Sequence, residues 1–107
     1  MVEFSGRPNL EAAKIKNVKT REETVLPVTG AFIAIGMLPN TVWLKGLLPL
    51  DEWGFIVTDV IMATEIPGIF AAGDVRSKLW RQISTAVGDG SVAAIAAENY
   101  LEELKRG

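Results

Sequence analysis

The chain begins with a weak alternation of hydrophobic and polar residues around a polar turn. Residues 14–18 alternate, residues 19–23 are polar, and residues 24–28 are again mostly apolar. Two such runs around a polar turn predict a β-hairpin with one solvent-facing side. Pro27 has no main-chain N–H, so the second strand is expected either at a sheet edge or to end there. Residues 1–12 lack a clear period and predict a loose lead-in.

Three continuous apolar runs follow the hairpin. Gly30–Gly36 is rich in β-branched residues and too short for a helix, which predicts a buried strand. Phe55–Thr58 and Ile69–Ala72 predict two further strands. Between Gly30–Gly36 and Phe55–Thr58, residues 42–45 predict a short helix that ends at Gly46.

The last quarter of the chain has a helical period from Gln82 to about Lys105. Asp89 and Glu98 are expected on its wet face rather than as an acid–base pair. Its large apolar contacts are expected from Ile83, Val87, Ile95, Leu101 and Leu104. Together these elements predict an α/β fold with a small sheet, a β-hairpin, a short helix and a long C-terminal helix.

Composition excludes most catalytic chemistry. The 107 residues include no cysteine and no histidine, which removes a Cys nucleophile, a Cys-x-x-Cys pair, an imidazole base and the common zinc ligands. With a net charge of −2, the chain has no overall positive potential that would attract nucleic acid. Any redox chemistry would therefore depend on a bound organic cofactor. The N-terminus lacks a signal-peptide pattern and no apolar run approaches membrane-spanning length, so we expect a soluble, cytoplasmic protein.

The most informative stretch runs from Pro67 to Gly90. A predicted strand ends at Gly73-Asp74, and a long helix begins shortly afterwards. Glycine permits close approach to the backbone, a carboxylate accepts hydrogen bonds from hydroxyls, and the start of a helix attracts negative charge. This combination suits a phosphorylated or sugar-bearing cofactor. Alternatively, Asp74 merely caps the end of a strand.

An ordered set of motifs gives the chain a family resemblance. The set comprises Gly30–Gly36 with Pro39-Asn40-Thr41, then Gly54 to Asp59, then Thr64 to Val75, then Arg81-Gln82 and the alanine-rich helix. Over residues 13–105 it closely resembles the C-terminal part of thioredoxin reductases, which are FAD- and NAD(P)H-dependent pyridine nucleotide–disulfide oxidoreductases.

The resemblance implies an assignment of segments and site residues. Residues 13–36 would correspond to the end of the NADPH domain and residues 37–107 to the C-terminal half of the FAD domain, folded together as one domain. Asp74 would accept hydrogen bonds from the ribityl chain of the flavin, and Gly73 would give access to the backbone. The pyrimidine side of the flavin ring would be lined by Arg81, Gln82 and Ile83.

The chain also lacks parts that the family uses. It has no Gly-x-Gly-x-x-Gly loop for the ADP half of FAD or for NADPH, and no redox-active Cys-x-x-Cys. We therefore expect a thioredoxin reductase-related protein or fragment that is incomplete for catalysis alone and binds FAD weakly or not at all.

Exposed apolar surface is a further expectation, because the predicted buried strands have few partners in so short a chain. It predicts a homo-oligomer or an association with a complementing reductase chain. The alternative to a flavin half-site is accordingly a flavin-free dimerisation or interaction module derived from the same fold.

Overall fold

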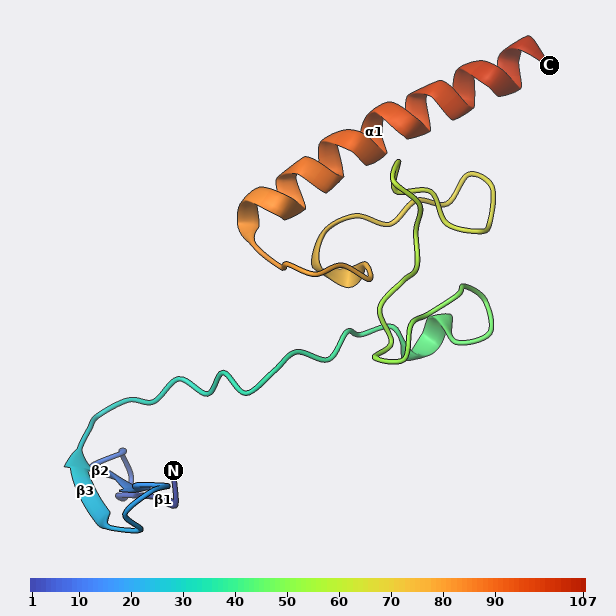
Figure 1. The fold of residues 1–107 in the computed structure, drawn as a ribbon. Helices are drawn as coiled ribbons and strands as arrows, with labels where there is room; N and C mark the ends of the chain where they lie inside the picture. Colours follow the sequence, from blue (N-terminus) through green and yellow to red (C-terminus); the bar gives the residue numbers. More distant parts are fainter. The chain divides into compact units, whose positions relative to one another are not determined.

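A computed structural model describes all 107 residues and divides them into two compact units, residues 1–36 and 37–107 (Figure 1). Folding of the whole chain as one domain stays a prediction. Residues 30–36 form no main-chain hydrogen bond to another segment.

The first unit is a three-stranded antiparallel sheet. Its strands are β1 (Glu3–Ser5), β2 (Ala12–Lys16) and β3 (Glu23–Pro27), in the order β1-β2-β3. The predicted hairpin is β2–β3, and β3 is an edge strand that ends at Pro27, as predicted. Strand β1 lies within the segment predicted to be a loose lead-in. Three paired residues are too few to produce a recognisable period.

Gly30–Gly36 does not form the predicted strand. The segment contains no strand, and Phe32, Ile33 and Ile35 are all largely exposed. Its continuous run of apolar residues predicts burial on both faces. A strand also needs neighbouring strands for its main-chain groups, and the described residues supply none here.

The second unit is built mainly from loops, followed by one long helix (Figure 1). The short helix predicted over residues 42–45 is the 3₁₀ helix η1 (Val42–Leu44). Ile56 links the loops: its N–H donates to Val75 and its carbonyl accepts from Ser77. The buried core consists of Leu44, Leu48, Ile56 and Ala71.

The strands predicted over residues 55–58 and 69–72 are reduced to single-residue bridges. Ile56 bridges Leu50 and Arg76, and Phe70 bridges Ala63. Longer pairing around Ile56 is interrupted by the Asp51–Phe55 turn on one side and by a 3₁₀ turn on the other. The apolar character of both segments is therefore used for packing rather than for extended ladders.

Helix α1 (Ile83–Arg106) matches the prediction within one residue at each end. Its many alanines favour helix formation, and Lys105 and Arg106 lie in the last turn, where the helix dipole favours positive charge. The predicted fold class is confirmed: a small antiparallel sheet and a long C-terminal helix. No helix of the chain contains an apolar stretch sufficient to cross a bilayer.

Candidate functional site

A single 3₁₀ turn presents the candidate site residue Asp74. Helix η2 (Gly73–Val75) begins at Gly73, whose φ of +83° lies in the left-handed region that favours glycine. Gly73 is buried, and a Cβ placed there would lie 3.6 Å from the Cβ of Ala86 on α1. Asp74, the next residue, is exposed. The positive φ therefore favours glycine at this position, while the side chain of the next residue is exposed.

Asp89 of α1 anchors this turn. One of its carboxylate oxygens accepts hydrogen bonds from the Gly73 amide at 3.1 Å, from Arg76 Nη1 at 3.0 Å and from Lys78 Nζ at 2.7 Å. Only 13% of its side chain is exposed. The prediction that Asp89 lies on the wet face of the helix is wrong, because its partners come from a loop that folds back over this part of α1. Glu98, in contrast, is exposed as expected.

The surroundings of Asp89 hold its carboxylate in the charged form. The hydrogen bond from Lys78 lowers its pKa most, burial opposes that effect, and Arg76 and the Gly73 amide lower it further, to about 2 from an ordinary value of 3.8. The folded state therefore binds the Asp89 proton less readily than the unfolded state does.

This difference predicts an acid dependence of stability. Because the pKa of Asp89 is depressed on folding, its contribution is fully present above about pH 3.8 and is lost as pH falls towards about 2. Urea unfolding of the wild type and of Asp89→Asn, measured from about pH 6 downwards, should show a stability gap that narrows through this window. A gap that stays constant down to pH 2 would rule out the proposed titration.

Arg81 fixes the path from the turn to the helix. Its Nε donates to the carbonyl of Asp74 at 2.9 Å, and Nη2 donates to the carbonyl of Arg76 at 3.0 Å. The guanidinium also lies over the Phe55 ring, 3.5 Å from the centroid. These contacts explain how a cation is accommodated just before the positive end of α1.

The structure brings four of the five predicted site residues to one hollow. The hollow has a volume of about 520 Å³ and is lined by Asp74, Arg81, Gln82 and Ile83, together with Ala86 and Val87. The fifth residue, Gly73, does not line the hollow and lies next to Ala86, which does. Residues from η2 and from the start of α1 thus meet at a single surface.

Gln82 marks the start of α1. Its main-chain N–H donates to the hydroxyl of Thr85 at 3.2 Å, and that hydroxyl donates to the main-chain carbonyl of Gln82 at 3.0 Å. The hollow therefore lies at the positive end of a 24-residue helix.

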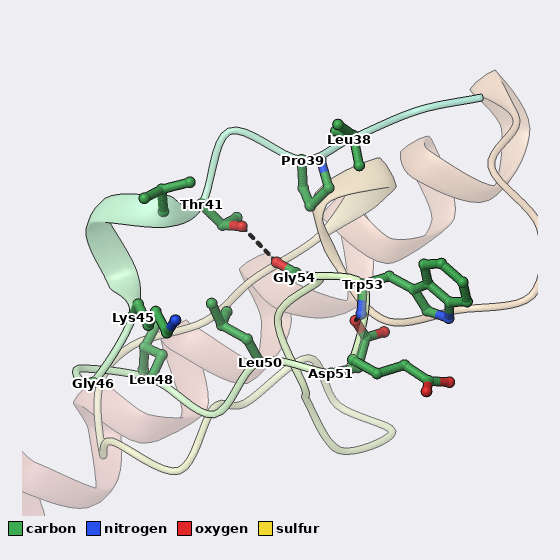
Figure 2. A pocket seen from close by; sticks show the side chains of 12 residues that line it. Leu38, Pro39, Thr41, Lys45, Gly46, Leu48, Leu50, Asp51, Trp53 and Gly54 are labelled. Carbon is green, nitrogen blue, oxygen red and sulfur yellow. Dashed lines mark hydrogen bonds between the residues drawn. The ribbon is translucent and has the colours of Figure 1, made fainter. Parts of the chain in front are cut away.

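A second hollow, of about 540 Å³, was not predicted from the sequence. It is formed by the loops around η1 and the Asp51–Gly54 turn (Figure 2). Thr41 donates its hydroxyl to the carbonyl of Gly54, while Trp53 extends away from Leu48 and Leu50 (Figure 2). None of the predicted site residues lines this hollow.

Known proteins resemble the chain over nearly its whole length. The family described as pyridine nucleotide-disulphide oxidoreductase matches residues 1–90. The chain belongs to this family. A thioredoxin reductase from Listeria monocytogenes is 50% identical over 93 residues, which cover 87% of the chain and 29% of the relative. A Clostridium pasteurianum protein described as a 34.2 kDa protein in the rubredoxin operon is 49% identical over 96 residues, covering 90% of the chain and 31% of that protein.

Solved structures of thioredoxin reductases are also similar to the chain. Thioredoxin reductase from Lactococcus lactis in the FR conformation has a TM-score of 0.78 and 46% identity. The thioredoxin reductase from T. acidophilum has a TM-score of 0.80 and 39% identity. Each comparison covers 94% of the chain and 33% of the solved chain. The resemblance to thioredoxin reductases is confirmed, and the chain spans about a third of their length.

Proposed function

We propose that the hollow between η2 and α1 is the ribityl–flavin half-site of an FAD-dependent disulfide oxidoreductase. The observation that carries the proposal is the convergence of Asp74, Arg81, Gln82 and Ile83 on one surface. Membership of the family supports a flavin as the ligand.

The residues present suit the ribityl chain and the ring. The exposed carboxylate of Asp74 accepts none of the bonds that fix the turn, since Arg81 donates to its main-chain carbonyl instead. It is therefore free to accept hydrogen bonds from the ribityl hydroxyls. Ile83 and Val87 supply apolar surface for the ring, and the start of α1 favours negative charge there. When bound, the flavin would supply the electron-transfer chemistry that these side chains lack.

The proposed site is half of a flavin site. The chain has no Gly-x-Gly-x-x-Gly loop to bind a pyrophosphate and no cysteine to exchange with a disulfide. Disulfide reduction would accordingly need a complementing polypeptide that carries both features.

Riboflavin is the probe that tests this half-site, because it has the ring and the ribityl chain and lacks the adenylate. We expect the chain to bind it and Asp74→Ala to weaken binding about tenfold or more, the loss of one charge-assisted hydrogen bond. Flavin fluorescence titration would measure both affinities.

Glu98→Ala is the matched control, since it removes an exposed carboxylate from α1 away from the hollow. It should leave riboflavin affinity unchanged. Equal binding by the wild type and Asp74→Ala would contradict the assignment of Asp74. No binding by the wild type at millimolar riboflavin would contradict the half-site itself.

A second candidate function is a flavin-free interaction module. The observation that favours it is the large exposure of apolar side chains in both units, including Phe32 and Ile35 in the first and Ile83 and Leu104 in the second. A colourless, stable oligomer of the purified chain would support this candidate, and a yellow protein would support the half-site.

A further inference from the structure

Arg81 connects the two walls of the hollow between η2 and α1. One wall is η2 with Asp74, and the other is the start of α1 with Gln82 and Ile83. Arg81 directly precedes Gln82 in the chain. Its side chain reaches across to the other wall, where it donates to the main-chain carbonyls of Asp74 at 2.9 Å and Arg76 at 3.0 Å. The separation of the two walls therefore depends on where the Arg81 guanidinium is held.

Phe55 provides a platform for this guanidinium. Only 6% of Phe55 is exposed, and Cζ of Arg81 lies 3.5 Å from the centroid of its ring. The quadrupole of the ring attracts a cation at this distance, and burial strengthens the attraction. Phe55 does not line the hollow, so any effect that it has on a ligand there must pass through Arg81.

The turn that precedes Phe55 holds it in place. One carboxylate oxygen of Asp51 accepts hydrogen bonds from the main-chain N–H groups of Trp53 and Phe55, both at 2.9 Å. The N–H of Asp51 donates in return to the carbonyl of Phe55 at 2.8 Å. Because both of these hydrogen bonds join Phe55 to Asp51, the ring has a fixed base from which to orient Arg81.

The contacts of Arg81 depend on the shape of its side chain rather than on its charge alone. A lysine would carry the same charge at this position. Only the planar fork of a guanidinium can donate to two carbonyls in fixed directions and stack on a ring at the same time. The start of a helix is moreover an unfavourable place for a cation, so the charge by itself does not explain the residue.

We propose that Phe55 is a positioning residue that acts through Arg81 to hold the carboxylate of Asp74 at the separation from α1 that a ribityl chain requires. The inference rests on the proposed half-site and extends it to a residue outside the hollow. Phe55 makes no contact with the flavin, and the Phe55–Arg81 pair serves as a clamp between the two walls.

Riboflavin titration of Phe55 variants tests the proposal. Phe55→Leu should weaken binding about three- to tenfold, because Arg81 loses its platform. Phe55→Tyr restores an aromatic face and should bind riboflavin as the wild type does. Trp53→Leu is the matched control, since it removes a ring that is 68% exposed from the same turn and outside the hollow. It should leave the affinity unchanged. Wild-type affinity in Phe55→Leu would overturn the proposal.

A second titration asks whether Phe55 acts by positioning Asp74. In an Asp74→Ala background no carboxylate remains to be positioned, so Phe55→Leu should change the affinity by less than about twofold. A merely structural role would weaken binding equally in both backgrounds, which would contradict the proposal. Arg81→Lys keeps the charge without the fork and should weaken binding as Phe55→Leu does. Wild-type affinity in Arg81→Lys would also overturn the proposal, and this variant serves the test if Phe55→Leu does not fold.

Nuclear magnetic resonance of the free chain tests the clamp without a ligand. The Nε–H of Arg81 should be shifted upfield by the ring current of Phe55 and should exchange slowly, because it is bonded to the carbonyl of Asp74. Phe55→Leu should abolish the shift and speed the exchange, and identical Arg81 signals in the two proteins would overturn the clamp. A wild type that shows these signals and binds no riboflavin would instead contradict the half-site, and with it the role of Phe55 in binding.

Discussion

The isolated chain is expected to bind FAD about 10²–10⁴-fold more weakly than a full-length thioredoxin reductase. The chain has no Gly-x-Gly-x-x-Gly loop and spans about a third of its relatives. Losing two charge-assisted hydrogen bonds to the pyrophosphate, each contributing about 1.5–3 kcal/mol, accounts for that range. Isothermal titration of both proteins with FAD would measure the difference.

The affinities of the chain for different flavins test the same prediction further. If only the ribityl and ring half is recognised, then FAD, FMN and riboflavin should bind the chain with similar affinity. A full-length reductase should prefer FAD strongly. Sub-micromolar FAD binding by the chain, or a clear preference for FAD over riboflavin, would mean that the adenylate is also recognised.

Replacing Asp89 by alanine is expected to destabilise the second unit by about 3 to 5 kcal/mol. The substitution leaves Arg76 and Lys78 without their shared carboxylate, and their side chains are only 15% and 9% exposed. Breaking a buried ion pair from one side costs this much because the remaining charge stays desolvated. The Gly73 amide loses its acceptor as well. Urea unfolding monitored by helical circular dichroism would measure the change.

Two further variants test whether the loss of stability in Asp89→Ala comes from its unpaired buried cations. Glu98→Ala removes an exposed carboxylate from the same helix and should alter stability by less than about 0.5 kcal/mol. Removing both cations with the carboxylate, as Asp89→Ala/Arg76→Met/Lys78→Met, should recover much of the loss, because no buried charge then remains unpaired. A loss below about 1 kcal/mol for Asp89→Ala would show that water reaches the two cations freely.

The sequence was most informative where structure depends on local patterns. Helix α1 has a long alanine-rich period, and the β2–β3 hairpin has two runs around a polar turn, so both could be predicted. Gly30–Gly36 was different, because its hydrophobic run shows a tendency towards strand and says nothing about a partner. The 107 residues provide no strand to pair with it, and it is exposed.

Asp89 shows what sequence reasoning missed in the site. A charged residue in a helix is normally solvated, and its partners lie 11 to 16 residues away in a loop whose path cannot be derived from periodicity. One signal was present: Asp89 falls in line with Ala86, Ala93, Ala96 and Tyr100. Small and aromatic residues on one helix face indicate packing, so a carboxylate in that line was a candidate for a buried anchor.

The bond from the Gly73 amide to Asp89 has a consequence for hydrogen exchange. An amide bonded to a helix side chain can exchange only when that contact opens. Because the same carboxylate also holds Arg76 and Lys78, we expect the turn and this part of α1 to open together. The Gly73 amide should then exchange about as slowly as the amides of the neighbouring helical turn, although Gly73 lies outside the helix.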